Sequence, residues 1–270
     1  MPLSEAPLIE MKNATVYRGD TRVFDRFSLT IPQHEPVAIL GPNGSGKTTL
    51  LKVINRELYP VQDDVSSVRI LGRDRWNVWS LRSRIGIVTH ELQAHYDASA
   101  TGLDVILSGF HSSIGVHGML AGRITAAQRE LAYTTLKSLD AHDLSGRRYT
   151  DMSTGQQRRC LLGRALVHDP DTLILDEPTA GLDLAAAFDY LERIRRLSEA
   201  GRNIVLVSHT TGEIPPEIQR VILLRSGQVI ADGKKDSVLT AHNLQRTFGV
   251  EVRIAMVAGH YFTYPAASRA

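Results

Sequence analysis

A glycine-rich octapeptide constrains the fold of this chain more than any other feature. It consists of Gly41, Pro42, Asn43, Gly44, Ser45, Gly46, Lys47 and Thr48, and it matches the pattern G-x-x-x-x-G-K-[ST]. The apolar run before it, residues 37–40, is typical of a strand buried on both faces. Residues 48–55, after it, have the pattern of a helix. A strand, this loop and a helix in that order predict a phosphate-binding loop in an α/β P-loop fold.

The residue types of the loop suit the phosphates of a nucleotide. Glycines let several backbone N–H groups face one anion, and the N-terminus of the following helix adds a partial positive charge. Lys47 can place its ammonium on the β- and γ-phosphates. The Thr48 hydroxyl is suited to ligate Mg²⁺, and Thr49 follows it at the start of the helix. The loop therefore predicts a nucleotide triphosphate with Mg²⁺.

A second signal is the apolar run at residues 173–175, which is followed directly by Asp176 and Glu177. A buried strand that ends in two carboxylates places them at the edge of the sheet where α/β proteins bind ligands. Asp176 is the candidate ligand of Mg²⁺, and Glu177 is the candidate general base that polarises the attacking water. Pro178 then ends the strand. A solvent-exposed acidic loop is the alternative, and the phosphate loop upstream argues against it.

The order of elements predicts an α/β core with additions. Candidate strands at residues 172–175 and 203–208 enclose a helix at residues 184–200, which Gly201 ends. A strand, a helix and a strand in this order predict a mostly parallel sheet with crossover helices. Two early strands, residues 9–17 and 22–31, flank a turn and predict an N-terminal antiparallel β subdomain.

The middle and the end of the chain differ from that core. From about residue 95 to 150 the sequence is helical, at residues 102–108 and 125–139, which predicts an inserted α-helical subdomain. The tail, residues 227–270, predicts short strands around a small helix near residues 236–248. We expect one domain over residues 1–270.

Composition excludes several classes of protein. The 31 basic and 29 acidic side chains give a net charge of +2, which predicts no nucleic-acid partner. Cys160 is the one cysteine, so no internal disulfide forms, and its apolar neighbours predict a core residue. No apolar run reaches the ~20 residues that cross a bilayer. We expect a cytoplasmic protein.

Residues 152–159 (MSTGQQRR) resemble the signature sequence of the ABC ATPases. Ser153 is a good N-cap for a helix that begins there, Gly155 lets the backbone approach an anion, and Gln156 follows it. The resemblance to this family extends to residues 180–183, which are similar to its D-loop. It also extends to His209, which resembles its switch histidine, and to Tyr17, which resembles the aromatic residue that stacks on adenine.

The family resemblance covers about residues 9–250 and implies a Mg²⁺-dependent ATPase. It implies a homodimer that forms on ATP binding, in which the Ser153 loop of one chain caps the γ-phosphate held by the other. It also implies separate transmembrane permease subunits, with the chain at the inner face of the plasma membrane. Residues 104–115 resemble a subgroup that includes the ModF and YlmA-like proteins, and the tail is similar to that of metal-chelate importer ATPases.

Two positions depart from the family pattern. Thr154 stands where the family usually has glycine. The family's Mg²⁺-contacting glutamine corresponds in position to His90, and Gln93 lies three residues later. Both remain candidates for that role; Gln93 is the residue we assign, as a catalytic side chain and as a metal ligand. A histidine there would bring a pH dependence.

Alternative functions remain open at this point. A soluble ABC ATPase in metallocentre assembly or regulation is the main alternative to a transporter subunit. A translation factor would carry two cassettes, and a repair ATPase would need coiled-coil arms before Ser153. A GTPase would carry N-K-x-D, which is absent. His111 and His117 form a weak candidate pair of metal ligands, which we expect to be loop or surface residues.

Overall fold

The computed structural model describes residues 6–93, 95–96, 99–116 and 122–266, and the chain divides into two compact units. The first unit combines the chain up to Val78 with the chain from Asn203 onward. The second unit is residues 79–202, and it contains the segment in which the helical subdomain is predicted.

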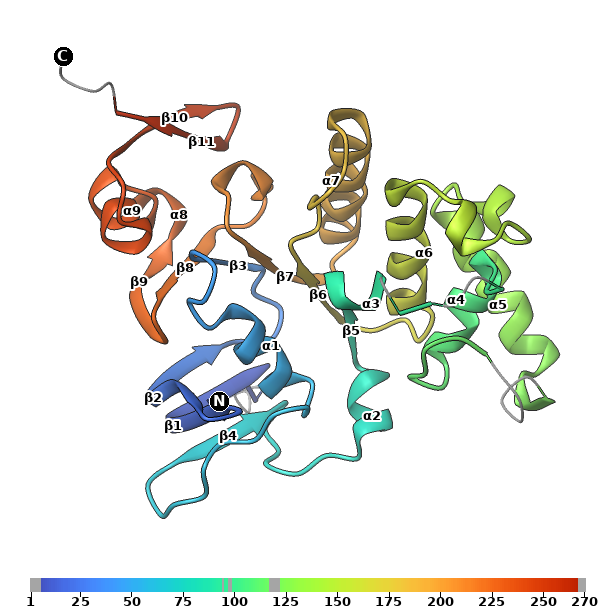
Figure 1. Ribbon diagram of the computed structural model, residues 1–270, viewed down its shortest axis with the longest axis horizontal. Coiled ribbons are helices and arrows are strands. Elements are labelled where there is room, and N and C mark those ends of the chain that lie inside the picture. The colour runs from blue at the N-terminus through green and yellow to red at the C-terminus, as the bar shows by residue number, and fades with distance from the viewer. Residues whose placement is uncertain (1–5, 94, 97–98, 117–121, 267–270) are drawn as a thin grey trace, which may run out of the picture. The chain divides into compact units, whose positions relative to one another are not determined.

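An antiparallel sheet of three strands opens the first unit, in the order β2-β1-β4 (Figure 1). Its strands are β1 (Ile9–Arg18), β2 (Thr21–Ile31) and β4 (Ser67–Ile70). Buried and exposed side chains alternate along β2, because one face of the sheet packs into the core. The predicted N-terminal antiparallel subdomain is confirmed, and β4 is an addition that sequence reasoning missed.

Strands of a second sheet carry the phosphate loop. They lie in the order β7-β3-β8-β9 and are β3 (Val37–Leu40), β7 (Asn203–Ser208), β8 (Arg220–Arg225) and β9 (Gln228–Lys234). β7 and β8 pair parallel with β3, and β9 pairs antiparallel with β8. Leu40 pairs with Ser208, so β3 and β7 end side by side. The phosphate loop and His209 therefore leave the sheet at the same edge.

Short elements complete the first unit. They are α1 (Lys47–Ile54), α8 (Lys235–Val238), α9 (Ala241–Phe248) and a hairpin of β10 (Val252–Val257) and β11 (His260–Pro265). The single helix expected near residues 236–248 is two helices, because Thr240 accepts a side-chain hydrogen bond from Asn243 N and caps α9. The strand β11 was not predicted.

The second unit joins a parallel strand pair to a helical cluster. The strands are β5 (Ile85–Val88) and β6 (Thr172–Asp176), with Val88 opposite Leu175. The helices are α2 (Val78–Arg82), which begins at the boundary between the units, α3 (His90–Gln93), α4 (Gly102–Gly109), α5 (Ala126–Ser138), α6 (Thr154–Leu166) and α7 (Leu184–Glu199). The predicted parallel strands and helical segment are confirmed.

Helices α4, α5 and α6 pack against one another in the second unit (Figure 1). Small residues allow the contact between α4 and α6: a Cβ on Gly163 would lie 2.7 Å from the Ile106 side chain. Cys160 is buried in this cluster, as predicted, and burial raises the pKa of its thiol to about 12. None of the described helices is long and apolar enough to span a membrane.

Candidate functional site

The phosphate loop lies between β3 and α1, as the sequence predicts. Ser45 N donates a hydrogen bond to the Pro42 carbonyl at 3.1 Å, and Gly44 and Gly46 have φ of 78° and 109°. Glycine is the residue that adopts this left-handed backbone without a steric penalty. Gly46 is the N-cap of α1, and the first N–H groups of a helix have no intrahelical partner. The loop therefore has the geometry of an anion-binding turn.

The three glycines of the loop differ in what an added Cβ would contact. A Cβ on Gly41 would lie 2.3 Å from the carbonyl oxygen of Leu224, and one on Gly46 would lie 2.8 Å from the Phe24 ring. A side chain at either position would therefore clash with the rest of the protein. A Cβ on Gly44 would meet nothing within 4 Å, so this side of the loop is open to a ligand.

Lys47 is held at the centre of the loop and is only 6% exposed. Its Nζ donates to the carbonyl oxygens of Gly41 at 2.7 Å and Pro42 at 3.1 Å. The hydroxyl oxygen of Ser45 is buried and has no hydrogen-bond partner among the described residues. A buried cation and an unpartnered hydroxyl beside the backbone N–H groups fit the negative charge and many acceptor atoms of a triphosphate.

Two further predicted residues belong to the same unit as the loop. Tyr17 lies near the end of β1, and its side chain is 44% exposed, so an aromatic face is available for stacking. His209 is exposed and follows β7 directly. The preceding Ser208 is buried, and its hydroxyl donates to a carboxylate oxygen of Glu213. This anchors the end of β7 and fixes where His209 leaves the sheet.

The two predicted acids lie in the second unit, at the end of β6. Asp176 is the last residue of the strand, and Glu177 follows it with φ of 46°. A left-handed backbone costs a non-glycine residue about 1–2 kcal/mol. The turn is closed by a hydrogen bond from Ala180 N to the Glu177 carbonyl oxygen at 3.1 Å. The two carboxylates thus leave a buried strand through a strained turn, an arrangement typical of functional sites.

Ser153 caps α6 as the sequence predicts. Gln156 N donates to its hydroxyl oxygen at 3.3 Å, and Ser153 N donates to the side-chain oxygen of Gln156 at 3.0 Å. This reciprocal pair is a capping box. It fixes the first turn of α6, whose N-terminus carries the partial positive charge of the helix. The side-chain oxygen of Gln156 is thereby used for the cap.

The residues between the two members of the capping box pack against α7 and the turn before it. A Cβ on Gly155 would lie 3.1 Å from the Cβ of Ala186, so a small residue is needed there for close packing. The Thr154 methyl group lies 3.9 Å from the Cβ position of Gly181. The threonine that replaces the family's usual glycine therefore lies close to the segment that resembles the D-loop, where a side chain at position 181 would contact it.

Gln93 and His90 differ in their surroundings. His90 is exposed at the start of α3. The side-chain amide of Gln93 donates to Oε1 of Gln157 on α6 at 2.8 Å, and Gln157 in turn donates to the Tyr149 carbonyl oxygen at 2.8 Å. Oε1 of Gln93 is buried and has no partner among the described residues. The oxygen of Gln93 is thus oriented and unused, as an oxygen ligand for Mg²⁺ needs to be.

The signature stretch contains two residues whose contacts sequence reasoning missed. Gln157 holds Gln93, and Arg158 donates to the Ala180 carbonyl oxygen at 3.4 Å. Their position within the signature stretch was a possible signal, but the partners lie far away in the sequence. The candidate metal pair is not tested, since His117 lies outside the described residues.

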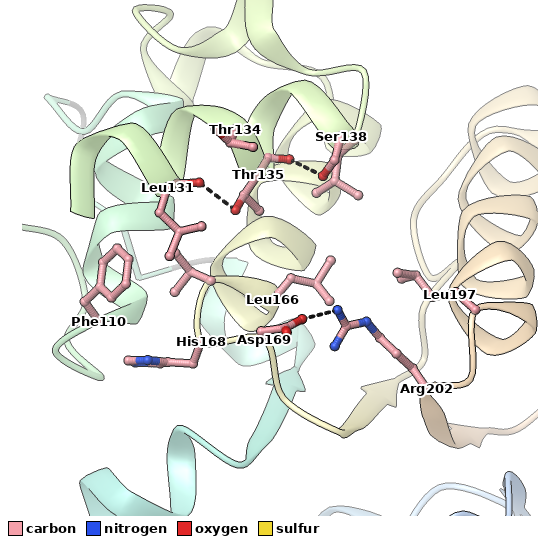
Figure 2. Close-up of a pocket in the computed structure, with 13 residues that line it drawn as sticks. Phe110, Leu131, Thr134, Thr135, Ser138, Leu166, His168, Asp169, Leu197 and Arg202 are labelled. Carbon is pink, nitrogen blue, oxygen red and sulfur yellow. Dashed lines mark hydrogen bonds and ion pairs between the residues drawn. The ribbon is translucent and has the colours of Figure 1, made fainter. Parts of the chain in front are cut away.

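A pocket of about 630 Å³ lies in the second unit at the opposite end of α6 from Ser153 (Figure 2). Apolar side chains from α5, α6 and α7, including Leu131, Leu166 and Leu197, form much of its lining. Asp169 and Arg202 form an ion pair at its rim. None of the predicted site residues lines it. This pocket is therefore distinct from the nucleotide-binding motifs.

Comparison with known proteins agrees with these motifs. The model of the ABC transporter family matches residues 24–180, more than half of the chain. The manganese transport system ATP-binding protein MntB of Bacillus subtilis (strain 168) is 33% identical over 241 residues, which cover 89% of this chain and 92% of MntB. The cobalt import ATP-binding protein CbiO of Rhodobacter capsulatus is 33% identical over 83% of this chain and 77% of CbiO.

Solved structures show the same fold. The chain matches a metal-chelate type ABC transporter in an inward-facing conformation, with a TM-score of 0.77 and 22% identity over 97% of this chain and 99% of that one. It also matches the dimeric ATP-binding cassette MJ0796 in a post-hydrolysis state with ADP and Pi, with a TM-score of 0.68 and 26% identity over 84% and 98%. The chain belongs to the ABC transporter family, in which it is an ATP-binding and ATP-hydrolysing subunit.

Proposed function

We propose that two copies of this chain close around two ATP molecules, and that each ATP contacts both copies. Lys47 and Thr48 of one copy bind the triphosphate, and the Ser153 loop of the other copy covers it. The observation that carries this proposal is that the chain has two helix N-termini with anion-binding character, those of α1 and α6. The dimeric cassette with ADP and Pi supports the arrangement.

We assign the remaining roles by residue type and position. Tyr17 stacks on adenine. Thr48, Asp176 and Gln93 would hold Mg²⁺, which would supply positive charge to the triphosphate when bound. Glu177 accepts a hydrogen bond from the attacking water and orients it toward the γ-phosphorus, while His209 contacts the γ-phosphate. ATP and water yield ADP and phosphate. Loss of the γ-phosphate removes the charge that both copies share, so the dimer opens.

The work of the dimer is transport through separate membrane subunits. MntB and CbiO are named as parts of transport systems, and the cassette that resembles this chain in Clostridium perfringens is described as part of a complex, CbiONQ. The chain contributes the ATP-driven closure and the partner contributes the pore. We therefore place it in the cytoplasm, bound to the inner face of the plasma membrane by its partner.

The central test uses Glu177→Gln, which keeps the shape of the side chain and removes the base. Turnover is expected to fall by about 10²-fold or more, while ATP and Mg²⁺ convert the chain to a dimer in size-exclusion chromatography with light scattering. Lys47→Ala is the matched control and stays monomeric with ATP. Normal turnover by the Glu177 variant would remove our assignment of the base.

The partner is tested separately by purification of the tagged chain from detergent extracts. Co-purification with polytopic membrane proteins supports the transporter subunit. Co-purification with soluble scaffold proteins alone contradicts it and favours the assembly ATPase considered above.

A further inference from the structure

Arg158 has an unusual environment for a charged residue. Its side chain is 0% exposed, and it lies in the second turn of α6, just after the Ser153 cap. One of its nitrogens, Nη2, donates to the Ala180 carbonyl oxygen at 3.4 Å. Nε and Nη1 are buried and have no hydrogen-bond partner, from a carboxylate or any other group, among the described residues. An unpaired buried cation lowers stability, so its presence needs a reason other than stability.

The contact with Ala180 connects α6 to the turn that carries Glu177. Ala180 N donates to the Glu177 carbonyl oxygen at 3.1 Å, while the Ala180 carbonyl oxygen accepts from Arg158. Two hydrogen bonds therefore join the signature helix to the backbone of Glu177. That backbone is in the left-handed region, so the turn depends on its surroundings to stay in place.

Two tyrosines, Tyr149 and Tyr190, lie near enough to Arg158 for its charge to act on them. Both tyrosines are buried, and their hydroxyl oxygens have no partner among the described residues. Burial raises the pKa of both phenols, so both stay neutral, and the nearby guanidinium works against that shift. Among the described residues, the guanidinium of Arg158 is hydrogen-bonded to a single backbone carbonyl. Replacement of a buried charge by an apolar side chain of similar volume is often neutral or stabilising.

We propose that Arg158 is a positioning residue that couples two parts of the same chain. It links the contact between the Ser153 loop and one nucleotide to the position of the Glu177 turn, which acts on the other nucleotide. The inference rests on the proposed dimer, in which the two loops of one chain work on different ATP molecules. Movement of the first turn of α6 moves the guanidinium, and the guanidinium holds the carbonyl oxygen of Ala180, the residue whose N–H closes the Glu177 turn. Hydrolysis at one site then depends on how the same chain contacts the other site.

The first test replaces Arg158 by methionine and by lysine in the full chain. For Arg158→Met we expect the maximal turnover to fall by about tenfold to a hundredfold, as for a misplaced catalytic group, with a melting temperature that is unchanged or higher. The half-saturating ATP concentration stays within about twofold, because ground-state binding is intact. Arg158→Lys restores part of the turnover, since an ammonium can still donate to the Ala180 carbonyl.

Arg196→Met is the control, because Arg196 is an exposed arginine of the second unit that pairs with Glu192 on α7 and lies outside the predicted site. It is expected to leave turnover unchanged. Unchanged turnover in Arg158→Met would overturn the proposal. Parallel losses of turnover and melting temperature in both Arg158 variants would also overturn it, since they would show a structural role alone.

Mixed dimers separate the effect on Glu177 from the effect on the Ser153 loop. Two differently tagged chains are combined so that each dimer has one intact Glu177 and one Glu177→Gln. Arg158→Met in the chain with the intact Glu177 is expected to slow turnover by about tenfold or more. Arg158→Met in the chain with Glu177→Gln is expected to leave most of the ATP turnover of the mixed dimer. The reverse order of the two rates would contradict the proposal.

Failure of the proposed dimer would be seen independently. If Glu177→Gln stays monomeric with ATP, the proposed dimer is wrong, and the role of Arg158, which rests on it, is wrong as well. If ATP forms the dimer and both mixed dimers are equally active, the dimer stands and the role of Arg158 is wrong.

Discussion

The side-chain amide of Gln93 donates a hydrogen bond of 2.8 Å to Oε1 of Gln157, and this joins α3 to the signature helix α6. Gln157 is held in turn, because its own amide donates to the Tyr149 carbonyl oxygen. The result is that the oxygen of Gln93 has one orientation and no partner among the described residues. We therefore expect Gln157 to affect Mg²⁺ binding through Gln93.

We predict that Gln157→Leu raises the Mg²⁺ concentration needed for half-maximal ATPase activity by about tenfold, the usual effect of losing a residue that orients a metal ligand. Leucine keeps the size of the side chain and removes both hydrogen bonds. The measurement is ATP turnover against Mg²⁺ at saturating ATP. In a Gln93→Ala background the same change is expected to add little, because the two residues act in series. Full additivity would contradict the shared role.

His90 gives the complementary prediction. It is exposed at the start of α3, whereas Gln93 is oriented by Gln157. We therefore expect His90→Ala to keep the Mg²⁺ dependence and the pH profile of turnover between pH 6 and 8, a range in which a histidine ordinarily titrates. Loss of a titration step in this variant would assign the role to His90 instead.

Ser153→Ala tests the capping box together with the ATP contact. Loss of an N-cap costs about 1 kcal/mol of folding stability. The matched control is Thr125→Ala, because Thr125 and Gln128 form the same kind of capping box at the start of α5. Both variants are expected to lose similar stability in urea unfolding. Only Ser153→Ala should weaken ATP-dependent dimer formation, and an equal loss in the control would remove the specific role of Ser153.

The sequence predicted the phosphate loop and the carboxylates at the end of β6 because their chemistry is local. The loop needs glycine at positions of positive φ, and those positions are visible as Gly44 and Gly46. A buried strand such as β3 is visible as an apolar run of the right length. The ABC signature was identified by its resemblance to the family, and the N-cap role of Ser153 within it was predicted from the residue type.

Other contacts could not be predicted, because they join segments that are distant in the sequence. Gln93 and Gln157 are 64 residues apart, and Arg158 and Ala180 are 22 apart. The strand β4 was missed for a related reason: its side chains alternate over four residues, and its pairing with β1 is what makes it a strand. Local sequence propensity carries little information about long-range side-chain contacts or about strand pairing.

Gly46→Ala is expected to disrupt the phosphate loop. The new Cβ would lie 2.8 Å from the Phe24 ring, and Phe24 is buried and stacked on Phe27 with ring centroids 4.3 Å apart. Overpacking and the strained φ together cost about 2–4 kcal/mol. Gly19→Ala is the control, because Gly19 also has positive φ but no neighbour within 4 Å of its Cβ position. We expect it to lose about 1–2 kcal/mol and to keep its ATP affinity in calorimetry, whereas Gly46→Ala loses ATP binding.

His168 is expected to make the folding stability depend on pH. Burial lowers its pKa below the ordinary value of 6.5, and the positive charge of Arg164 and the neighbouring His111 act in the same direction. Hydrogen bonds with the backbone of Gly109 and Phe110 oppose that shift. Below pH 6.5 the unfolded chain therefore binds a proton that the folded chain does not, so stability is lost as the pH falls from 6.5 through the folded pKa.

The measurement is the free energy of unfolding in urea at intervals between pH 7.5 and 5, for the wild type and for His168→Gln. Each pH unit between the two pKa values removes about 1.4 kcal/mol, and the variant is expected to show a smaller loss because glutamine has no proton to gain. His142→Gln, a change at an exposed histidine, is the control and should follow the wild type. An identical slope in all three proteins would show that the acid sensitivity arises elsewhere.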